Sequence, residues 1–430
     1  MRGSAVIAVA MGVMNLTTYG FTILAARLLG PAEYGALAAV MGLLLVVNVL
    51  SLGLQATGAR RVSAAPQDLA VIEREVMSTS YASSLALGAV VLLAAPLVTA
   101  VLRLEHWGAA ALIAVTAVPL SVMGGQAGIL QGERRWGPLA AIYLSMGLGR
   151  IGFGIVALLV EPNTLGAMTG VAVGALLPVV VGWLALRRPD RREAARTAAR
   201  PDTRDRVHRW APGGVLRETL HNSHALLAFF ALSNADVVIA RSTLGEHQAG
   251  LYAGGLILSK AVLFLPQFVV VIAFPSMAES NAGKDRHLLS LGAVLLIGAV
   301  TVAGVAVLSG LAVVFIGGPE YAALRGRLWM FATLGTLLAL LQLMVYNIVA
   351  RQRQRAVLLV WAALAVLALA SPLVGSLTGL LTTVLVVDVV LFLVLLARSL
   401  APSYGVPVPV HARRDPAGPG DPVGQVSTER

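Results

Sequence analysis

The stretch ARLLGPAEYGAL, residues 26–37, is a short polar interruption between two long apolar runs. A related stretch, ARSTLGEHQAGLYAG, occurs at residues 240–254, half the chain further on. Each stretch opens with an Ala-Arg dipeptide, and each carries two glycines five positions apart. The glycines match as pairs separated by 215 residues: Gly30 with Gly245, and Gly35 with Gly250.

Two further features recur at nearly the same offset. Glu105 in LEHWG corresponds to Glu320 in PEYAA, and Arg135 in GERRW lies close to the counterpart of Arg351 in ARQRQR. These matches predict a duplicated unit of six helices, with chance similarity of glycine-rich loops as the alternative. Because six is even, both copies enter a membrane in the same sense, and parallel repeats of this kind place a substrate path between the two halves.

The composition is that of a membrane protein. Of the 430 residues, 57% are hydrophobic and only 12% are charged, and the mean hydropathy is +0.82. Soluble domains carry about 25% charged residues. The continuous apolar runs approach the length of a membrane-spanning helix, whereas a β-barrel needs alternating segments of about ten residues. The absence of cysteine excludes disulfides and thiolate metal sites.

Apolar segments predict an all-α polytopic protein of about twelve transmembrane helices, arranged as two six-helix bundles around a central cavity. We expect the N-terminal bundle at 1–186, a basic cytoplasmic linker at 187–216, the C-terminal bundle at 217–400 and a disordered tail at 401–430. The predicted spans are 4–26, 35–57, 80–102, 108–130, 139–160, 165–186, 219–240, 248–274, 288–316, 327–350, 356–374 and 376–397.

The positive charges predict the orientation. With the N-terminus inside, 25 of the 32 Lys and Arg residues fall in inside loops or termini and five fall in outside loops. This asymmetry places both termini in the cytoplasm. The net charge of +11 therefore reflects topology and contact with anionic lipid headgroups, and it does not indicate a nucleic-acid partner.

Several motifs resemble the polysaccharide-biosynthesis flippases of O-antigen and other lipid-linked oligosaccharides, within the multidrug/oligosaccharidyl-lipid/polysaccharide (MOP) flippase superfamily. The resemblance covers most of residues 10–350, although LGEHQAG lacks the expected proline. It implies two six-helix bundles and export of polyprenyl-pyrophosphate-linked glycans across the inner membrane. The motifs are ARLLGPAEYGALAAVMGLL (26–44), GLQATGARRVS (53–63), NADVVIARSTLGEHQAGLYAGGLIL (234–258), LPQFVVVIAFPSMAE (265–279) and GGPEYAAL (317–324).

Ionisable residues inside predicted spans are candidate site residues, because a charge at the bilayer centre costs about 2.5–3.5 kcal/mol on insertion scales. Arg150 and Lys260 lie near the middle of the fifth and eighth spans. They are expected to receive an anionic headgroup, since an Arg fork holds phosphate bidentately. The alternative is a packing role, through an ion pair with Asp236 or a bond to a backbone carbonyl.

Three further residues complete the candidate substrate-binding set. Asp236 lies near the outer end of the seventh span and is expected to partner a basic residue or to bind a coupling proton or sodium ion. Arg27 and Arg241 end the first helix of each half, where they would line the mouth of the cavity or extend to the interface. Asp388 in the last span is expected to be structural. His221 and His224 share a helix face, without an evident third metal ligand.

The primary functional prediction is a flippase that exports a lipid-linked anionic glycan by alternating access, with no catalytic residues and no resident cofactor. Its expected partners are membrane lipids and a glycan polymerase or glycosyltransferases. A multidrug or cation antiporter of the same superfamily would call for an acid-rich cavity. A membrane glycosyltransferase or polymerase would call for a large outer loop, and every predicted outer loop is short. A major-facilitator transporter is disfavoured because GARRVSAAP stands where that family has an acidic-glycine motif.

Overall fold

The structure, a computed structural model, describes residues 2–187, 214–277, 283–350 and 356–400. Helices and short 3-10 turns account for the regular structure of this part of the chain, which contains no strand. Most of the linker predicted at 187–216 and the whole tail at 401–430 lie outside the described residues. The all-α prediction is confirmed.

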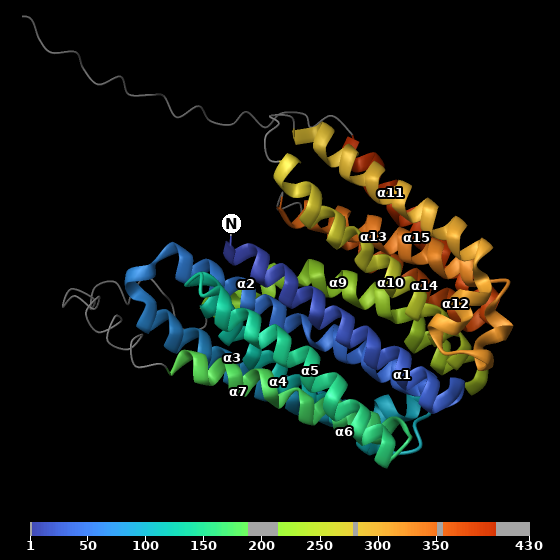
Figure 1. Ribbon diagram of the computed structural model, residues 1–430, viewed down its shortest axis with the longest axis horizontal. Helices are drawn as coiled ribbons and strands as arrows, with labels where there is room; N and C mark the ends of the chain where they lie inside the picture. Colours follow the sequence, from blue (N-terminus) through green and yellow to red (C-terminus); the bar gives the residue numbers. More distant parts are fainter. Residues whose placement is uncertain (1, 188–213, 278–282, 351–355, 401–430) are drawn as a thin grey trace, which may run out of the picture.

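The quoted stretch forms the first hairpin of the fold. Helix α1 (Arg2–Val47) is interrupted at Gly30, whose φ of 67° and ψ of 176° are not helical, and α2 (Val49–Ala64) follows it. Glycine has no Cβ, so it adopts a positive φ at little cost, and Pro31 fixes the backbone that follows. Figure 1 shows α2 lying beside the start of the chain, so α1 turns back on itself at Gly30.

The remaining helices belong to two lobes. The N-terminal lobe continues with α3 (Leu69–Leu102), α4 (Trp107–Gly132), α5 (Trp136–Val160), α6 (Thr164–Gly174) and α7 (Leu176–Leu186). The C-terminal lobe contains α9 (Gly214–Thr243), α10 (Glu246–Met277), α11 (Gly283–Val307), α12 (Ser309–Ile316), α13 (Leu328–Ala350), α14 (Val357–Ala370) and α15 (Leu377–Leu400).

Eight or nine stretches of the described residues could cross a membrane by their length and composition. Eight stretches are long and apolar enough to cross a membrane, and α11 with α12, bent by 96°, form a ninth. The stretch Ala5–Ala64 contains two passes, because α1 reverses at Gly30. Helix α14 lies within a shorter apolar stretch, Val357–Leu373. Leucines on α3 are largely exposed, as expected of a surface that faces lipid: Leu85, Leu93 and Leu97 are 63%, 82% and 67% exposed.

Close helix packing holds each lobe together. In α4, a Cβ placed on Gly128 would lie 2.5 Å from the carbonyl oxygen of Gln55 in α2. Small residues of this kind let transmembrane backbones approach, since apolar side chains gain little by leaving lipid for protein.

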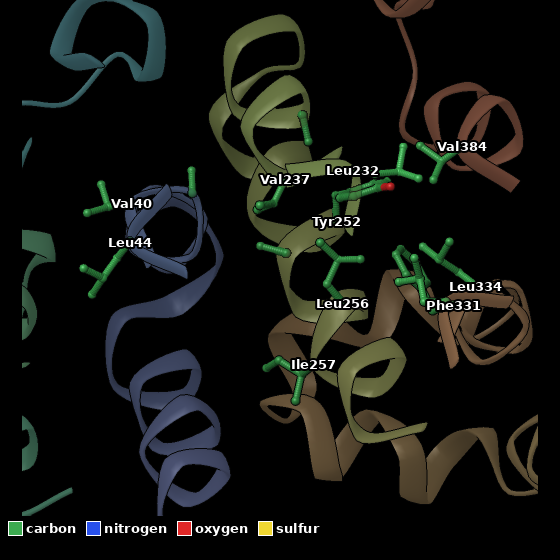
Figure 2. Close-up of a cluster of buried hydrophobic side chains, with 14 of the residues drawn as sticks. Val40, Leu44, Leu232, Val237, Tyr252, Leu256, Ile257, Phe331, Leu334 and Val384 are labelled. Carbon is green, nitrogen blue, oxygen red and sulfur yellow. The ribbon is translucent and has the colours of Figure 1, made fainter. Parts of the chain in front are cut away.

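A continuous apolar cluster joins the lobes. Figure 2 shows its central part, in which α1 faces α9 and α10, with α13 and α15 behind them. Tyr252 and Phe331 pack edge to face, with ring centroids 5.4 Å apart. The labelled side chains are Val40, Leu44, Leu232, Val237, Tyr252, Leu256, Ile257, Phe331, Leu334 and Val384.

The bundle has two ends, which we name by their loops. The linker end contains the start of α1, the end of α7 and the start of α9; the hairpin end contains Gly30 and the α9–α10 turn. In Figure 1 the lobes meet at the hairpin end, on the right, and diverge toward the linker end. This shape positions the cavity described next.

Candidate functional site: the cavity between the lobes

A cavity lies between the two lobes, with about 1370 Å³ of space not filled by atoms, open solvent at its mouth included. Helices α1 and α5 form one wall, and α9, α10 and α13 form the other. Most of the lining is apolar, and aromatic rings are prominent in it: Tyr19, Phe21, Tyr34, Phe229 and Phe230. The central cavity predicted from the repeat is therefore present.

Arg150 of α5 reaches this cavity from the N-terminal lobe. The residue is 8% exposed, and among the described residues its guanidinium has no hydrogen-bond or ion-pair partner. A guanidinium carries five N–H donors. The structure does not show the alternative packing role for Arg150, an ion pair with Asp236. The N–H donors of the Arg150 guanidinium are therefore available to a bound anion.

Lys260 of α10 reaches the same cavity from the C-terminal lobe. Its Nζ donates to Oδ1 of Asn234 at 2.8 Å, and Asn234 also lines the cavity. The Lys260 ammonium interacts electrostatically with the Asp236 carboxylate. The structure thus brings together the two basic residues selected from the sequence, one from each lobe, and within the part of the chain that it describes only Lys260 has a polar partner.

Asp236 lies behind the cavity wall, 2% exposed, and does not line the cavity. Its Oδ1 accepts from the backbone N–H of Val237 at 2.8 Å, and its Oδ2 accepts from the hydroxyl of Tyr252 at 3.2 Å. In Figure 2 the Tyr252 side chain extends toward Val384 of α15. Asp236 is therefore part of the interior of the C-terminal lobe.

A second carboxylate accompanies Asp236. Asp388, one turn beyond Val384 in α15, is 1% exposed and interacts electrostatically with both Asp236 and Tyr252. Its Oδ1 has no hydrogen-bond partner among the described residues. Sequence reasoning set Asp388 aside as structural, and no spacing signal connects residues so far apart. Two buried carboxylates with an unsatisfied oxygen form a polar cluster that could hold a cation.

Arg27 and Arg241 are absent from the cavity lining. Arg27 Nη2 donates to the carbonyl oxygen of Val314 at 2.6 Å. Arg241, which is 4% exposed, donates to the carbonyl oxygens of Leu102 and Arg103 at 2.9 and 3.1 Å. The expected position at the cavity mouth is corrected, because the last carbonyls of a helix lack partners within it and attract these donors.

Sequence reasoning missed a polar contact at the linker end. Glu218 of α9 binds both Arg60 and Arg61 of α2, and the Arg61 contact measures 3.1 Å. Arg61 also reaches Glu75 of α3 at 3.2 Å, and its side chain is 6% exposed. These arginines were read only as signs of orientation. An acidic residue at the start of the first helix of the second half was the available signal.

The histidine pair makes a local contact. His224 Nδ1 lies 2.7 Å from the carbonyl oxygen of His221. Within the described residues no group of three His, Cys, Asp or Glu side chains could hold a metal ion.

Comparison with known proteins gives a family and a fold. Residues 1–281 match the family described as "Polysaccharide biosynthesis protein". No curated protein matches the chain. Among solved structures, an inward-facing multidrug resistance MATE family transporter of the MOP superfamily has a TM-score of 0.65 at 14% identity, with 90% of this chain and 94% of that chain covered.

Two further structures share the fold. The outward-facing form of a multidrug resistance MATE family transporter of the MOP superfamily gives a TM-score of 0.62 at 15% identity, with coverage of 93% and 94%. A single-site mutant of the Vibrio cholerae MATE transporter VcmN gives 0.57 at 13% identity, with coverage of 92% and 96%. At sequence identities this low, the similarity to these structures shows a shared fold.

Proposed function

Because the chain belongs to the polysaccharide biosynthesis protein family and has the fold of MOP-superfamily transporters, we propose that it moves a polyprenyl-pyrophosphate-linked oligosaccharide across the cytoplasmic membrane. The anionic headgroup binds in the central cavity, and the prenyl chain stays in lipid. The two lobes then rock about that fixed site, in the alternating-access manner of transporters built from repeats. No covalent step is involved.

One observation carries the proposal: two cations from opposite lobes line one cavity whose described lining contains no carboxylate. A pyrophosphate binds between such groups through charge-assisted hydrogen bonds, which are about twice as strong as neutral ones. Arg150 offers a planar fork for two oxygens, whereas Lys260 acts as a point charge. Because Arg150 and Lys260 belong to different lobes, the strength of pyrophosphate binding depends on how far apart the two lobes lie.

The apolar part of the lining suits the remainder of the headgroup. Phe229, Phe230 and Tyr19 present aromatic faces in the cavity. Sugar rings have apolar faces that pack on such surfaces, while Thr18, Ser233 and Gln342 offer hydrogen bonds to hydroxyl groups. The cavity thus combines anion binding with surfaces for a neutral glycan.

The linker end is the cytoplasmic end in this proposal, and both termini are cytoplasmic. The excess of Arg at that end supports this orientation and contact with anionic headgroups. A lipid-linked glycan made inside would enter from the linker end and leave from the hairpin end. Cytoplasmic glycosyltransferases and a polymerase on the other side are the expected partners.

A coupling ion, H⁺ or Na⁺, binds at Asp236 and Asp388 in this scheme. The support is their burial, their mutual electrostatic interaction and the unsatisfied Oδ1 of Asp388. A cation there would offset two buried carboxylates, which otherwise carry a large desolvation cost. Lys260 lies between this cluster and the cavity, so ion and substrate affect one another through its charge.

A multidrug antiporter is the second candidate, because the similar structures are described as multidrug transporters. Organic cations would require acidic groups at the cavity surface. The carboxylates Asp236 and Asp388 lie behind the wall, and two basic groups face the space. Export of a cationic dye at a rate matching glycan-lipid transport would favour this alternative.

The test uses purified protein in liposomes with a fluorescent polyprenyl-pyrophosphate glycan. Arg150→Gln and Lys260→Gln remove the charge while keeping a polar, hydrogen-bonding side chain. We expect each to lower the transport rate at least about tenfold, equivalent to roughly 1.4 kcal/mol. Arg74→Gln, at an exposed position on α3, is the matched control and retains the parent rate. Parent rates in both single variants and in the double variant would refute the headgroup site.

A further inference from the structure

The two repeated turns pack directly on each other at the hairpin end. A Cβ placed on Gly35 would lie 2.8 Å from Cα of Gly250, and one placed on Gly250 would lie 1.7 Å from the carbonyl oxygen of Pro31. No side chain fits at either position while the turns touch. The two glycines therefore keep the lobes in backbone contact.

Arginines reinforce this contact in a reciprocal way. Arg27 of the N-terminal lobe binds the carbonyl oxygen of Val314, near the end of α12 in the C-terminal lobe. Arg241 of the C-terminal lobe binds the carbonyl oxygen of Leu102, the last residue of α3 in the N-terminal lobe. A cation is favoured at a helix C-terminus, where carbonyls lack partners. We call the glycine contact and these two bonds the hairpin-end gate.

A separate contact joins the lobes at the linker end. Thr219 of α9 donates to the Thr57 hydroxyl of α2 at 3.2 Å, and both side chains are buried. Glu218, the residue directly before Thr219, binds Arg60 and the buried Arg61, which lie about one turn after Thr57 in α2. We call this contact the α2–α9 seam.

We propose that the α2–α9 seam is a hinge that stays closed during transport while the hairpin-end gate opens. This rests on the proposed alternating access, since opening the hairpin end must separate Gly35 from Gly250. When the gate opens, water replaces the hydrogen bonds between its arginines and the backbone carbonyls, so the net loss of hydrogen bonding is small. Separating the seam would instead part the buried hydroxyls of Thr219 and Thr57 and take Glu218 from both of its arginines, so that Arg61 keeps only the Glu75 contact within its own lobe.

The chain contains no cysteine, so one introduced thiol is the only group that a maleimide can label. Ala25→Cys places this thiol on the cavity lining, at a side chain with 0% exposure. A membrane-impermeant maleimide is added from the hairpin side of reconstituted vesicles. The parent is expected to label slowly, because the gate covers the position.

Opening the gate should raise that rate. Gly250→Val cannot fit against Pro31, so we expect labelling about tenfold faster than in the parent. Gly245→Val is the matched control in the same turn, where a Cβ has nothing within 4 Å, and it should label at the parent rate. An unchanged rate in folded Gly250→Val overturns the gate. If that variant fails to fold, Arg27→Gln combined with Arg241→Gln replaces it, with the same expectation.

The hinge is tested in the same background with Thr57→Cys and Thr219→Cys, oxidised to a disulfide before labelling. We expect the disulfide to leave the tenfold increase intact. A return to the slow parent rate, reversed by a reductant, would show that the seam must open and would overturn the hinge. Labelling needs no substrate, so these outcomes are independent of whether the glycan assignment is correct.

Discussion

At the residue scale, charge burial separates the ionisable groups into distinct roles. Among the described residues, Arg150 lines the cavity without a partner, whereas Asp388 is enclosed with an unsatisfied oxygen. Replacing Asp388 with Asn keeps the shape and removes a buried charge, which is costly without a partner. We expect unfolding of the detergent-solubilised variant at an equal or higher temperature, while the rate of ion-driven transport falls at least about tenfold, roughly 1.4 kcal/mol in activation free energy. Transport and ion dependence at parent levels would contradict a coupling role.

At the element scale, backbone approach decides which substitutions a helix tolerates. A methyl group on Gly128 of α4 would lie 2.5 Å from a backbone oxygen of α2, whereas one on Gly152 of α5 meets nothing within 4 Å. Gly128→Ala should therefore destabilise the protein by about 1–3 kcal/mol through overpacking. Gly152→Ala should stabilise it by up to about 1 kcal/mol through helix propensity. Thermal unfolding followed by tryptophan fluorescence compares the two, and equal midpoints would refute the packing argument.

At the scale of the whole molecule, the distribution of Arg sets the orientation in the membrane. Gln67 at the linker end and His247 at the hairpin end are both exposed. In the cysteine-free chain, His247→Cys should react with an impermeant thiol reagent in intact cells. Gln67→Cys should react only after the membrane is permeabilised. The opposite pattern would reverse the orientation and the direction of transport proposed above.

The sequence by itself determined the helical membrane class, the repeat and the approximate spans, because apolar length and period are local properties of the chain. It also located Arg150 and Lys260, since a charge inside an apolar run is evident without any contact. The turn at Gly30 was predictable for a similar reason: glycine permits a positive φ and proline fixes φ, and both effects act at the residue itself.

Only the tertiary structure decided the contacts between distant residues. Asp388 joins Asp236, Glu218 binds Arg61, and Arg27 and Arg241 bind carbonyls of the opposite lobe instead of lining the cavity. These pairings depend on how the two bundles dock. Docking follows from shape and backbone approach summed over many side chains, and no single stretch of sequence encodes it.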